Sequence, residues 1–299
     1  MPVNASIRKL VPPPLQPLAR STHHIVGQAT SGLRMMPSFL VIGGQRCGTT
    51  SIFKSLSEHP EVMRPPVEKG IDYFTLHYYR SMTWYRSHFP LEPVARARSH
   101  AHRKPIAFEA CTYYMFHPFA LERIAADLPD IKLVAMLRDP VERAFSAYKH
   151  ELARGFETEK DFVKALELED TRLEGEVERM RSDPHYESHP HRHQAYRRRG
   201  DYAEQLERAF TLFPTDQIHV LESEAFFASP QTEFDKLTDF LGLSPFTPER
   251  FDQHNARPGP PMPEAARTLL EEHYRPQDSR LAEVLGREPA WVHGSRGHG

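Results

Sequence analysis

The sequence has little cysteine, no long hydrophobic run and almost no net charge. Its two cysteines, Cys47 and Cys111, are too few for a disulfide framework and lie in apolar contexts, which suits a reducing compartment. No apolar run approaches the roughly 18 residues of a membrane-spanning helix, and the N-terminus lacks a signal-peptide pattern. With 38 basic against 40 acidic residues the net charge is -2, which argues against coating nucleic acid or an anionic membrane. We expect a cytoplasmic protein with no integral membrane segment, whose anion sites are local.

The chain is predicted to hold one domain between two irregular ends. Residues 1–36 contain "VPPPLQP" and "STHH" without sustained periodicity, so we expect an irregular N-terminal extension. Residues 291–299, which end in "HGSRGHG", are expected to form a flexible tail. Residues 37–290 show no internal repeat and no linker, and the 299-residue length is compatible with one large domain.

Strand and helix patterns alternate within this domain. Apolar runs typical of buried parallel strands lie at 39–44, 106–110, 131–139 and 217–223, and helical patterns lie at 49–58, 119–128, 202–213 and 229–242. This alternation predicts an α/β fold of three layers, with a central parallel sheet flanked by helices. The segment 161–181 is predicted to be one charged helix.

Two helix starts carry local signals. In "DPVERAFSAYKHEL", Asp139 is expected to cap the helix, Pro140 to occupy the first helical position and Glu142 to close a capping box. Ser229, followed by a proline, is expected to cap the helix at 229–242 in the same way.

The stretch "FLVIGGQRCGTTSIFKSL" places a glycine-bearing loop between a strand and a helix. Backbone N–H groups and the dipole at a helix N-terminus bind anionic oxygens, and the hydroxyls of Thr49, Thr50 and Ser51 add donors. The loop departs from the nucleotide triphosphate motif G-x-x-x-x-G-K-[ST], because Thr49 stands at the lysine position and Arg46 lies inside the loop. No aspartate suited to hold magnesium clearly follows a second strand. We therefore expect a metal-free phosphate compound, with a simple tight turn as the alternative.

A second anion site is indicated by "LRDPVERAFS". Arg138 ends a predicted strand, and Ser146 lies two turns into the next helix, so both can face a phosphate beside the sheet edge. The alternative is that Arg138 pairs with a carboxylate and Ser146 is a surface hydroxyl. The two sites together require a ligand with separated phosphates.

These motifs resemble those of the sulfotransferases that use PAPS (3′-phosphoadenosine-5′-phosphosulfate), in particular bacterial relatives of the heparan sulfate N- and 3-O-sulfotransferases. "GGQRCGTTS" resembles that family's 5′-phosphosulfate loop, and "LRDPVERAFSAY" resembles its 3′-phosphate segment. Further similarity runs through "HPEVMRPPVEKGIDYF", "FEACTYYMFHP", "RRRGDYAEQLERAFTLFPTDQIHVLESEAFFASP" and "DFLGL". The resemblance covers about residues 37–290 and implies a P-loop-like fold.

The resemblance implies transfer of the sulfuryl group of PAPS to a hydroxyl or amine of a small-molecule, lipid or glycan acceptor, in line and without a metal. The residues that it implies for binding PAPS and its desulfated product PAP are Arg46, Cys47, Gly48, Thr49, Thr50, Ser51, Lys69, Arg138, Ser146, Arg199 and Gly200. Arg46 stands where relatives usually carry lysine. Because arginine keeps its proton at working pH, we expect Arg46 to stabilise charge on the bridging oxygen and not to act as a general acid.

The general base departs from the family pattern. Where relatives read K-E-x-x-F-F this chain reads "KGIDYF", so Gly70 replaces the glutamate that the resemblance implies as base. Nearby candidates are Asp72, Glu68 and Glu109. We favour Glu109 and Asp72 jointly, because a carboxylate at the C-terminal end of a strand points into the crevice where ligands bind in open α/β sheets. For each, a solvated carboxylate or a structural ion pair is the alternative.

The stretch "HYESHPHRHQAYRRRGDY" is rich in histidine and arginine. Its histidine spacing matches no common zinc site and no cysteine is near, so we expect no metal. We predict a loop on the acceptor side, in which Arg197, Arg198 and Arg199 attract an anion and Tyr196 and Tyr202 stack on a ring or sugar. The segment 254–263, with Arg257 and Gly259, lies where relatives close a loop over the nucleotide.

Two other functions remain open from the sequence. The glycine loop also suits a magnesium-dependent small-molecule kinase, which would prefer ATP with magnesium over PAP. The loss of the glutamate at Gly70 also suits a catalytically weakened relative that binds PAP or a glycan without turnover. The acceptor stays open, because acceptor loops vary on a common fold.

Overall fold

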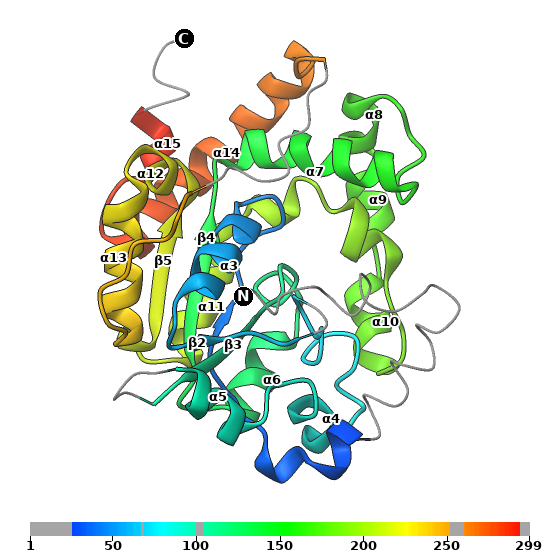
Figure 1. Cartoon of the computed structure of the whole chain (residues 1–299). Helices are drawn as coiled ribbons and strands as arrows, with labels where there is room; N and C mark the ends of the chain where they lie inside the picture. Colours follow the sequence, from blue (N-terminus) through cyan, green and yellow to red (C-terminus); the bar gives the residue numbers. More distant parts are fainter. Residues whose placement is uncertain (1–25, 67–68, 100–103, 252–259, 294–299) are drawn as a thin grey trace.

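The computed structural model describes residues 26–66, 69–99, 104–251 and 260–293 (Figure 1). One five-stranded sheet has the strand order β2-β3-β1-β4-β5, and every neighbouring pair is parallel. Its strands are β1 (Pro37–Val41), β2 (Val62–Met63), β3 (Ile106–Ala110), β4 (Lys132–Leu137) and β5 (Ile218–Glu222). The predicted parallel sheet is confirmed, and the short edge strand β2 was not predicted.

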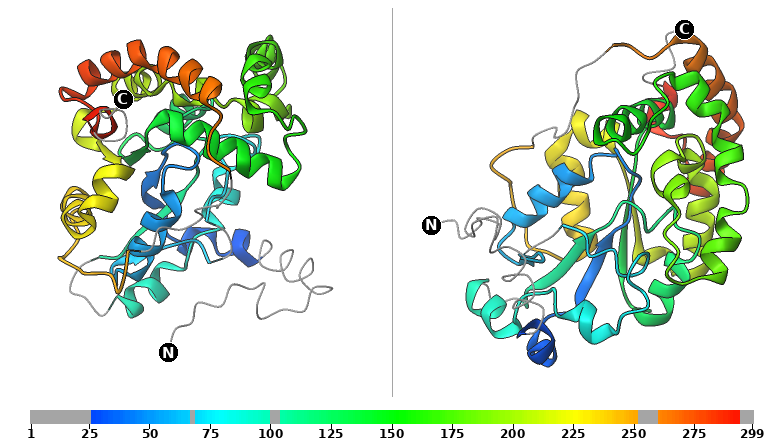
Figure 2. Two further views of the ribbon diagram at one scale, coloured as in Figure 1. Left: turned by 90° about the horizontal axis from the view of Figure 1, so that it is seen from above. Right: turned by 90° about the vertical axis from the view of Figure 1, so that its right-hand side faces the viewer.

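Helices cover both faces of the sheet. The chain runs from β1 through α3 (Thr49–Glu58) to β2, and from β3 through α6 (Ala120–Asp127) to β4 in the opposite direction across the sheet. Because such crossovers are right-handed, the two helices lie on opposite faces. Helix α11 (Tyr202–Leu212) packs beside α6, while α3 covers the other face (Figures 1 and 2). The predicted three-layer α/β fold is confirmed.

The remaining helices surround these three layers. They are α4 (Met82–Arg86), α5 (Glu92–Arg98), α7 (Pro140–Arg154), α8 (Phe162–Glu167), α9 (Glu169–Leu173), α10 (Glu176–Ser182), α12 (Ser223–Ala228), α13 (Pro230–Leu241), α14 (Glu264–Leu285) and α15 (Ala290–His293). Short 3₁₀ or π turns are η2 (Ser31–Leu33), η3 (Pro190–Gln194), η4 (Arg198–Gly200) and η5 (Thr215–Gln217). Helix α14 packs on α7 and α11. In the described part of the chain, no helix is both long and apolar enough to cross a membrane.

The predicted start of α7 is half correct. The Oδ1 of Asp139 accepts from the backbone N–H of Val141 at 3.0 Å, so Asp139 caps the helix. Glu142 does not close a capping box, because the N–H of Asp139 donates to Glu224 (3.0 Å) and Glu142 accepts from Arg267 (2.8 Å). Glu224, which is distant in the sequence, therefore accepts the hydrogen bond that Glu142 was predicted to accept.

One further local prediction is half correct and another is wrong. Ser229 is the N-cap residue of α13 and a proline follows it, as predicted, but its side chain makes no capping hydrogen bond. The segment 161–181 forms the three helices α8, α9 and α10 instead of one, and Gly175 adopts the left-handed conformation (φ 72°) that interrupts the helical path before α10. Glu169 and Phe162 are buried on this subdivided segment, so it is not a wholly solvated face.

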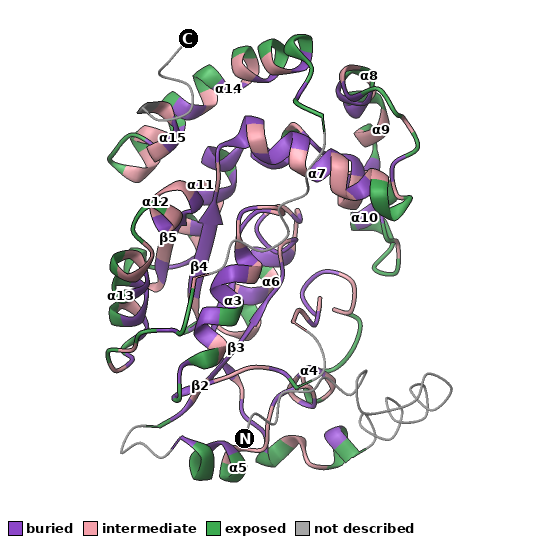
Figure 3. Ribbon diagram, turned by 45° about the horizontal axis from the view of Figure 1, so that its top comes forward, coloured by how far each residue is buried: buried purple, intermediate pink, exposed green. Residues whose placement is uncertain are grey.

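The buried core follows the sheet and continues into the predicted tail (Figure 3). Trp291 has an exposed fraction of 0%, and its Nε1 donates to Oδ1 of Asp278 at 3.1 Å. The flexible-tail prediction is therefore wrong for 291–293, and residues 294–299 lie outside the described chain. At the other end, 26–36 includes η2 and a backbone bridge between Arg34 and Leu91, whereas 1–25 lie outside the described chain.

Candidate active site

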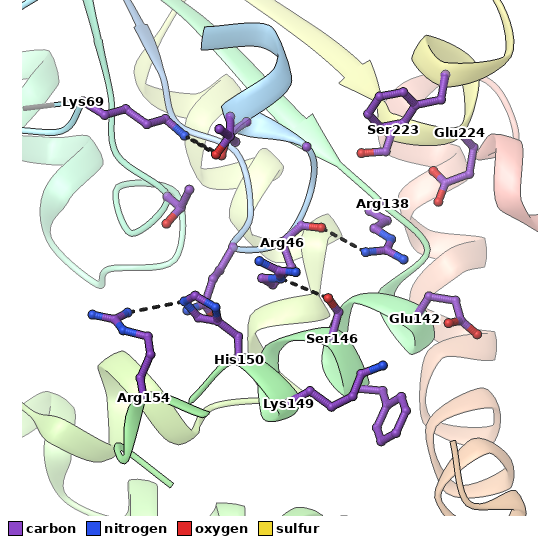
Figure 4. Close-up of a pocket in the computed structure, with 17 residues that line it drawn as sticks. Arg46, Lys69, Arg138, Glu142, Ser146, Lys149, His150, Arg154, Ser223 and Glu224 are labelled. Atoms are coloured by element: carbon purple, nitrogen blue, oxygen red, sulfur yellow. Dashed lines mark hydrogen bonds between the residues drawn. The ribbon is translucent and has the colours of Figure 1, made fainter. Parts of the chain in front are cut away.

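The carboxyl ends of four strands lead to one polar cavity. The loop after β1 supplies Arg46, the segment after β3 supplies Thr112, and β4 and β5 are followed by Arg138 and Ser223. These residues line a cavity of about 570 Å³, which we call the wide cavity; it also includes Thr49, Thr50, Lys69 and Ser146 (Figure 4). Ligands of open α/β sheets bind at this edge, so the wide cavity is the candidate site.

The loop between β1 and α3 presents backbone donors to this cavity. Gly48 precedes α3 in a left-handed conformation (φ 79°), and no side chain caps the helix. The first N–H groups of a helix have no intrahelical partner, so those of Thr49 and Thr50 are available to an anion. The carbonyl of Cys47 accepts from the Ser223 hydroxyl at 2.7 Å, which holds the loop against the start of α12.

The two predicted anion motifs meet in the wide cavity. The Nε of Arg46 donates to Oγ of Ser146 at 3.0 Å, and Nη1 of Arg138 donates to the Arg46 carbonyl at 3.2 Å (Figure 4). Arg46 has a left-handed backbone (φ 72°), a conformation that costs a non-glycine residue free energy and is often found at functional sites. The loop and α7 therefore bring two guanidinium groups to one surface of the cavity, which the carboxylates of Glu142 and Glu224 also line.

Lys69 joins this surface from the segment that follows β2. Its Nζ donates to the hydroxyls of Thr49 at 3.0 Å and Thr50 at 3.3 Å. Burial lowers the pKa of Lys69 to about 8. At neutral pH Lys69 is thus mostly protonated. An anion bound in the cavity would favour the charged form of Lys69 and so raise its pKa.

A second, smaller cavity of about 250 Å³ adjoins the first. We call it the narrow cavity; it includes Asp72, Arg192, His193 and Arg199, and it shares Gln45, Lys69, Thr112 and Arg154 with the wide cavity. Lys69 therefore lies where the two cavities meet. Two cavities that join beside a partly buried cation can bring two substrates together.

The two predicted base residues occupy different environments. Glu109 is fully buried: Oε2 accepts from the N–H of Ile71 (2.6 Å), and Oε1 accepts from the hydroxyls of Tyr85 and Tyr114 (both 2.8 Å). Burial raises the pKa of Glu109 to about 7, although its three hydrogen bonds oppose this. Glu109 is not among the residues that line either cavity.

Asp72, in contrast, lines the narrow cavity. Its Oδ1 accepts from Sγ of Cys111 at 2.8 Å, and its Oδ2 lies 3.5 Å from Nη2 of Arg192. Its backbone is left-handed, with φ 55°. Asp72 is thus the predicted carboxylate nearer to a substrate, although it is already held by a thiol and a guanidinium.

Gly70 has no room for a side chain in this conformation. A Cβ there would lie 2.7 Å from the carbonyl oxygen of Ala110, whose N–H donates to the Lys69 carbonyl at 3.1 Å. The backbone beside Lys69 therefore packs directly on the end of β3. This contact gives a steric reason for glycine at position 70, where the resemblance implies glutamate.

Several predicted binding residues do not line the cavities. Cys47 and Ser51 are buried, and burial raises the pKa of the Cys47 thiol to about 11. Gly200 faces Tyr274, whose hydroxyl would clash with an added Cβ. Arg199 does line the narrow cavity, where its Nη1 donates to Oε1 of Gln45 at 3.0 Å. The direct roles of Cys47, Ser51 and Gly200 remain predictions.

The histidine- and arginine-rich loop is packed differently from the prediction. Tyr196 and Tyr202 each have an exposed fraction of 1%, so the prediction that they stack on a substrate is wrong. Arg197 and Arg198 pair with Asp170. Within the described ranges no group of three or more possible metal ligands gathers, and Glu68, Arg257 and Gly259 fall outside those ranges.

Three basic side chains of the wide cavity were missed. Lys149, His150 and Arg154 follow Ser146 on α7 at intervals of three, four and eight residues, and all four line the cavity. Residues with this spacing share one helix face. The helical period of "SAYKHELAR" was therefore a signal for them.

Comparison with known proteins agrees with this geometry. The chain matches the sulfotransferase domain family over residues 36–257. It is 25% identical to the membrane-associated sulfotransferase kil1 of Dictyostelium discoideum, covering 87% of this chain and 67% of that protein. It is 26% identical to the human bifunctional heparan sulfate N-deacetylase/N-sulfotransferase 3, covering 86% of this chain and 31% of that protein. The chain thus spans about a third of the length of this second relative.

A solved structure supports the same assignment. A sulfotransferase from Alicyclobacillus acidocaldarius superimposes with a TM-score of 0.63 at 29% identity, covering 85% of this chain and 98% of that chain. The predicted resemblance to sulfotransferases is thereby confirmed. The family model matches most of this chain. The chain therefore belongs to the sulfotransferase domain family, and sulfuryl transfer is its function.

Proposed function

We propose that the sulfuryl donor is PAPS and that the acceptor is a hydroxyl or amine of a small molecule, lipid or glycan. The observation that carries this proposal is the meeting of the Arg46 loop and the Arg138–Ser146 segment in one cavity of about 570 Å³. PAPS carries a phosphosulfate and a separate phosphate, which match these two anion sites. The adjoining narrow cavity then receives the acceptor.

The 5′ side of PAPS binds at the start of α3. The N–H groups and hydroxyls of Thr49 and Thr50 hold the 5′-phosphosulfate, where the helix dipole also favours negative charge. Arg138 and Ser146 bind the 3′-phosphate, with Lys149 on the same face of α7. The reacting sulfur is then positioned near Lys69, at the junction of the cavities.

Catalysis in this proposal is positioning and charge stabilisation. As the bond from sulfur to the bridging oxygen breaks, negative charge grows on the 5′-phosphate of PAP. The protonated Lys69 and the guanidinium of Arg46 stabilise this charge in a partly enclosed site. These cations take the place that a metal would have, so the transfer proceeds without one.

Binding and transfer measurements test the proposal. Calorimetric titration with PAP and with ATP plus magnesium compares the two donors, and we expect PAP to bind more tightly. Radiolabelled sulfate from PAPS should appear on members of a panel of phenols, aliphatic alcohols and amines, and a chelator should leave the rate unchanged. Absent PAP binding, or preference for ATP with magnesium, would instead support the kinase.

We also propose a cytoplasmic location. Its support is that Cys47 and Cys111 are both buried and unbridged, which agrees with a reducing environment. Fractionation of the producing cell with an antibody to the chain tests this; recovery with membranes or in the medium would oppose it.

A further inference from the structure

A buried glutamate holds a histidine at the edge of the narrow cavity. Glu151, in the last turn of α7, has an exposed fraction of 0%. Its Oε2 lies 2.9 Å from Nδ1 of His193, in η3, and its Oε1 accepts from Nε2 of Gln45 at 2.6 Å. Two loops of the site are thus tied to one carboxylate.

The charge state of Glu151 determines the histidine tautomer. Burial alone would raise the pKa of Glu151, but the hydrogen bonds from His193 and Gln45 reverse this and place the pKa below its ordinary value. An ionised carboxylate accepts only, so Nδ1 of His193 must carry the proton. The lone pair of the neutral imidazole is then on Nε2.

Nε2 is the ring nitrogen available to a substrate. His193 lines the narrow cavity together with Lys69 and Asp72. One face of its ring packs on Phe156, with centroids 4.2 Å apart. Within the described residues its ring makes one hydrogen bond, to Glu151, and 12% of the side chain is exposed. The arrangement resembles a base oriented by a third group, the general form in which enzymes hold an imidazole.

Other bases are less well placed. Gly70 offers no side chain, and Glu109 gives both oxygens to three buried donors outside the cavities. Asp72 lines the cavity, but Cys111 and Arg192 already occupy its two oxygens. Both oxygens of Asp72 therefore already have partners, whereas Nε2 of His193 makes no hydrogen bond among the described residues.

We propose that Nε2 of His193 takes the proton of the acceptor and that Glu151 is the residue that positions it. This inference rests on the proposed use of PAPS. The acceptor's O–H or N–H bond breaks as the acceptor atom bonds to sulfur, and the proton goes to Nε2. The electron pair of the breaking sulfur–oxygen bond stays on the 5′-phosphate of PAP. The imidazolium, paired with Glu151, later returns its proton to solvent.

The charges around the ring come from every side of the site. They are Glu151, His150 and Arg154 on α7, His189 before η3 with its ring centroid 5.0 Å away, and Lys69, Asp72, Arg192 and Arg199 across the narrow cavity.

Nitrogen-15 NMR of imidazole-labelled protein tests the tautomer without any substrate. The His193 resonance, identified by its loss in His193→Gln, should show the proton on Nδ1, and Glu151→Gln should redistribute it between the two nitrogens. A proton fixed on Nε2 in the wild type would overturn the proposal. This measurement does not depend on which donor or acceptor the enzyme uses.

Kinetics with PAPS and the best acceptor of the panel give the second test. His193→Gln should lower kcat by about 10²- to 10⁴-fold while PAP binds as in the wild type. The matched control is His189→Gln, whose ring bonds the Phe156 carbonyl and does not line the narrow cavity; it should keep wild-type turnover. In a plot of kcat/KM against pH, the decrease toward acidic pH should become smaller in His193→Gln.

The outcomes separate this inference from the proposed function. With para-nitrophenol, which is ionised at the assay pH and needs no base, His193→Gln should lose far less rate than with an un-ionised acceptor such as phenol. Equal losses with both, or retained turnover in His193→Gln with loss in Asp72→Asn, would overturn the role of His193 alone. Failure of the wild type to bind PAP would overturn the donor instead.

Discussion

The Nζ of Lys69 donates to Oγ1 of Thr49 across 3.0 Å and so connects the segment after β2 to the first turn of α3. This contact places a partly buried ammonium group at the N-terminal end of a helix that already attracts anions. It also places Lys69 at the junction of the wide and narrow cavities. The protonation of this one side chain should therefore be coupled to donor binding.

We predict that PAP binding takes up protons at alkaline pH. Free Lys69 has a pKa of about 8 because burial disfavours its charge, so much of it is neutral near pH 9. A bound anion favours the charged form and raises this pKa, so affinity falls as pH rises through about 8. Calorimetry in buffers of different ionisation heat should detect uptake of up to one proton near pH 9 and little near pH 7. In Lys69→Arg the uptake should vanish; equal uptake there would contradict the assignment.

Arg46 should act on the chemical step. Because its guanidinium lines the wide cavity and bonds Ser146, Arg46→Ala should lower kcat by about 10²- to 10³-fold. Arg46→Lys retains a positive charge and should recover much of this loss, whereas Ser146→Ala should mainly weaken PAP binding. Single-turnover rates with labelled PAPS measure the step directly. Wild-type turnover in Arg46→Ala would refute the role.

Glu109 provides a test of the base assignment made from the sequence. If Glu109 is structural, as its three buried hydrogen bonds suggest, Glu109→Gln should keep turnover, because the tyrosine hydroxyls can turn to accept from the new amide. A loss of 100-fold or more, in about the range for a removed base, with the fold intact, would restore Glu109 as the base.

The same variant should change how stability depends on pH. The pKa of Glu109 rises from 4.5 to about 7 on folding, so the folded state binds the extra proton between these values. Relative to Glu109→Gln, the wild type should therefore lose on the order of 3 kcal/mol of unfolding free energy as pH rises from 4.5 to 7. Glu109→Gln has no such titration. Urea unfolding of both proteins across this range gives the difference, and identical slopes would contradict the raised pKa.

Local chemistry explains which features were predictable. The glycine loop before Thr49 and the Asp139–Pro140 helix start carry their signals within a few residues, and both lie where predicted. The same locality explains the error at Glu142, whose expected place beside Asp139 is taken by Glu224 from a distant segment. Local motifs specify that a backbone N–H will be capped but not which carboxylate caps it.

The contacts that complete the site are nonlocal. Glu151 and His193 are 42 positions apart, and only the packing of η3 against α7 brings their side chains together. The stretch around His193 was predicted to lie on the acceptor side, but nothing in the sequence links this histidine to Glu151. Trp291 was missed for the same reason, because it is buried against α14 through a bond to Asp278.

Gly70 should resist replacement by the glutamate that the resemblance implies at this position. An added Cβ would lie 2.7 Å from the Ala110 carbonyl oxygen, so Gly70→Glu must displace the backbone beside Lys69. Overpacking of this kind costs about 1–3 kcal/mol, and Gly70→Ala is the matched control because it adds the clash without a carboxylate. We expect both variants to lose similar unfolding free energy in urea, and Gly70→Glu to leave the defect of His193→Gln unrepaired. If Gly70→Glu instead raised turnover in the His193→Gln background, the chain would have kept a place for the family's glutamate, and His193 would be only one of two possible bases.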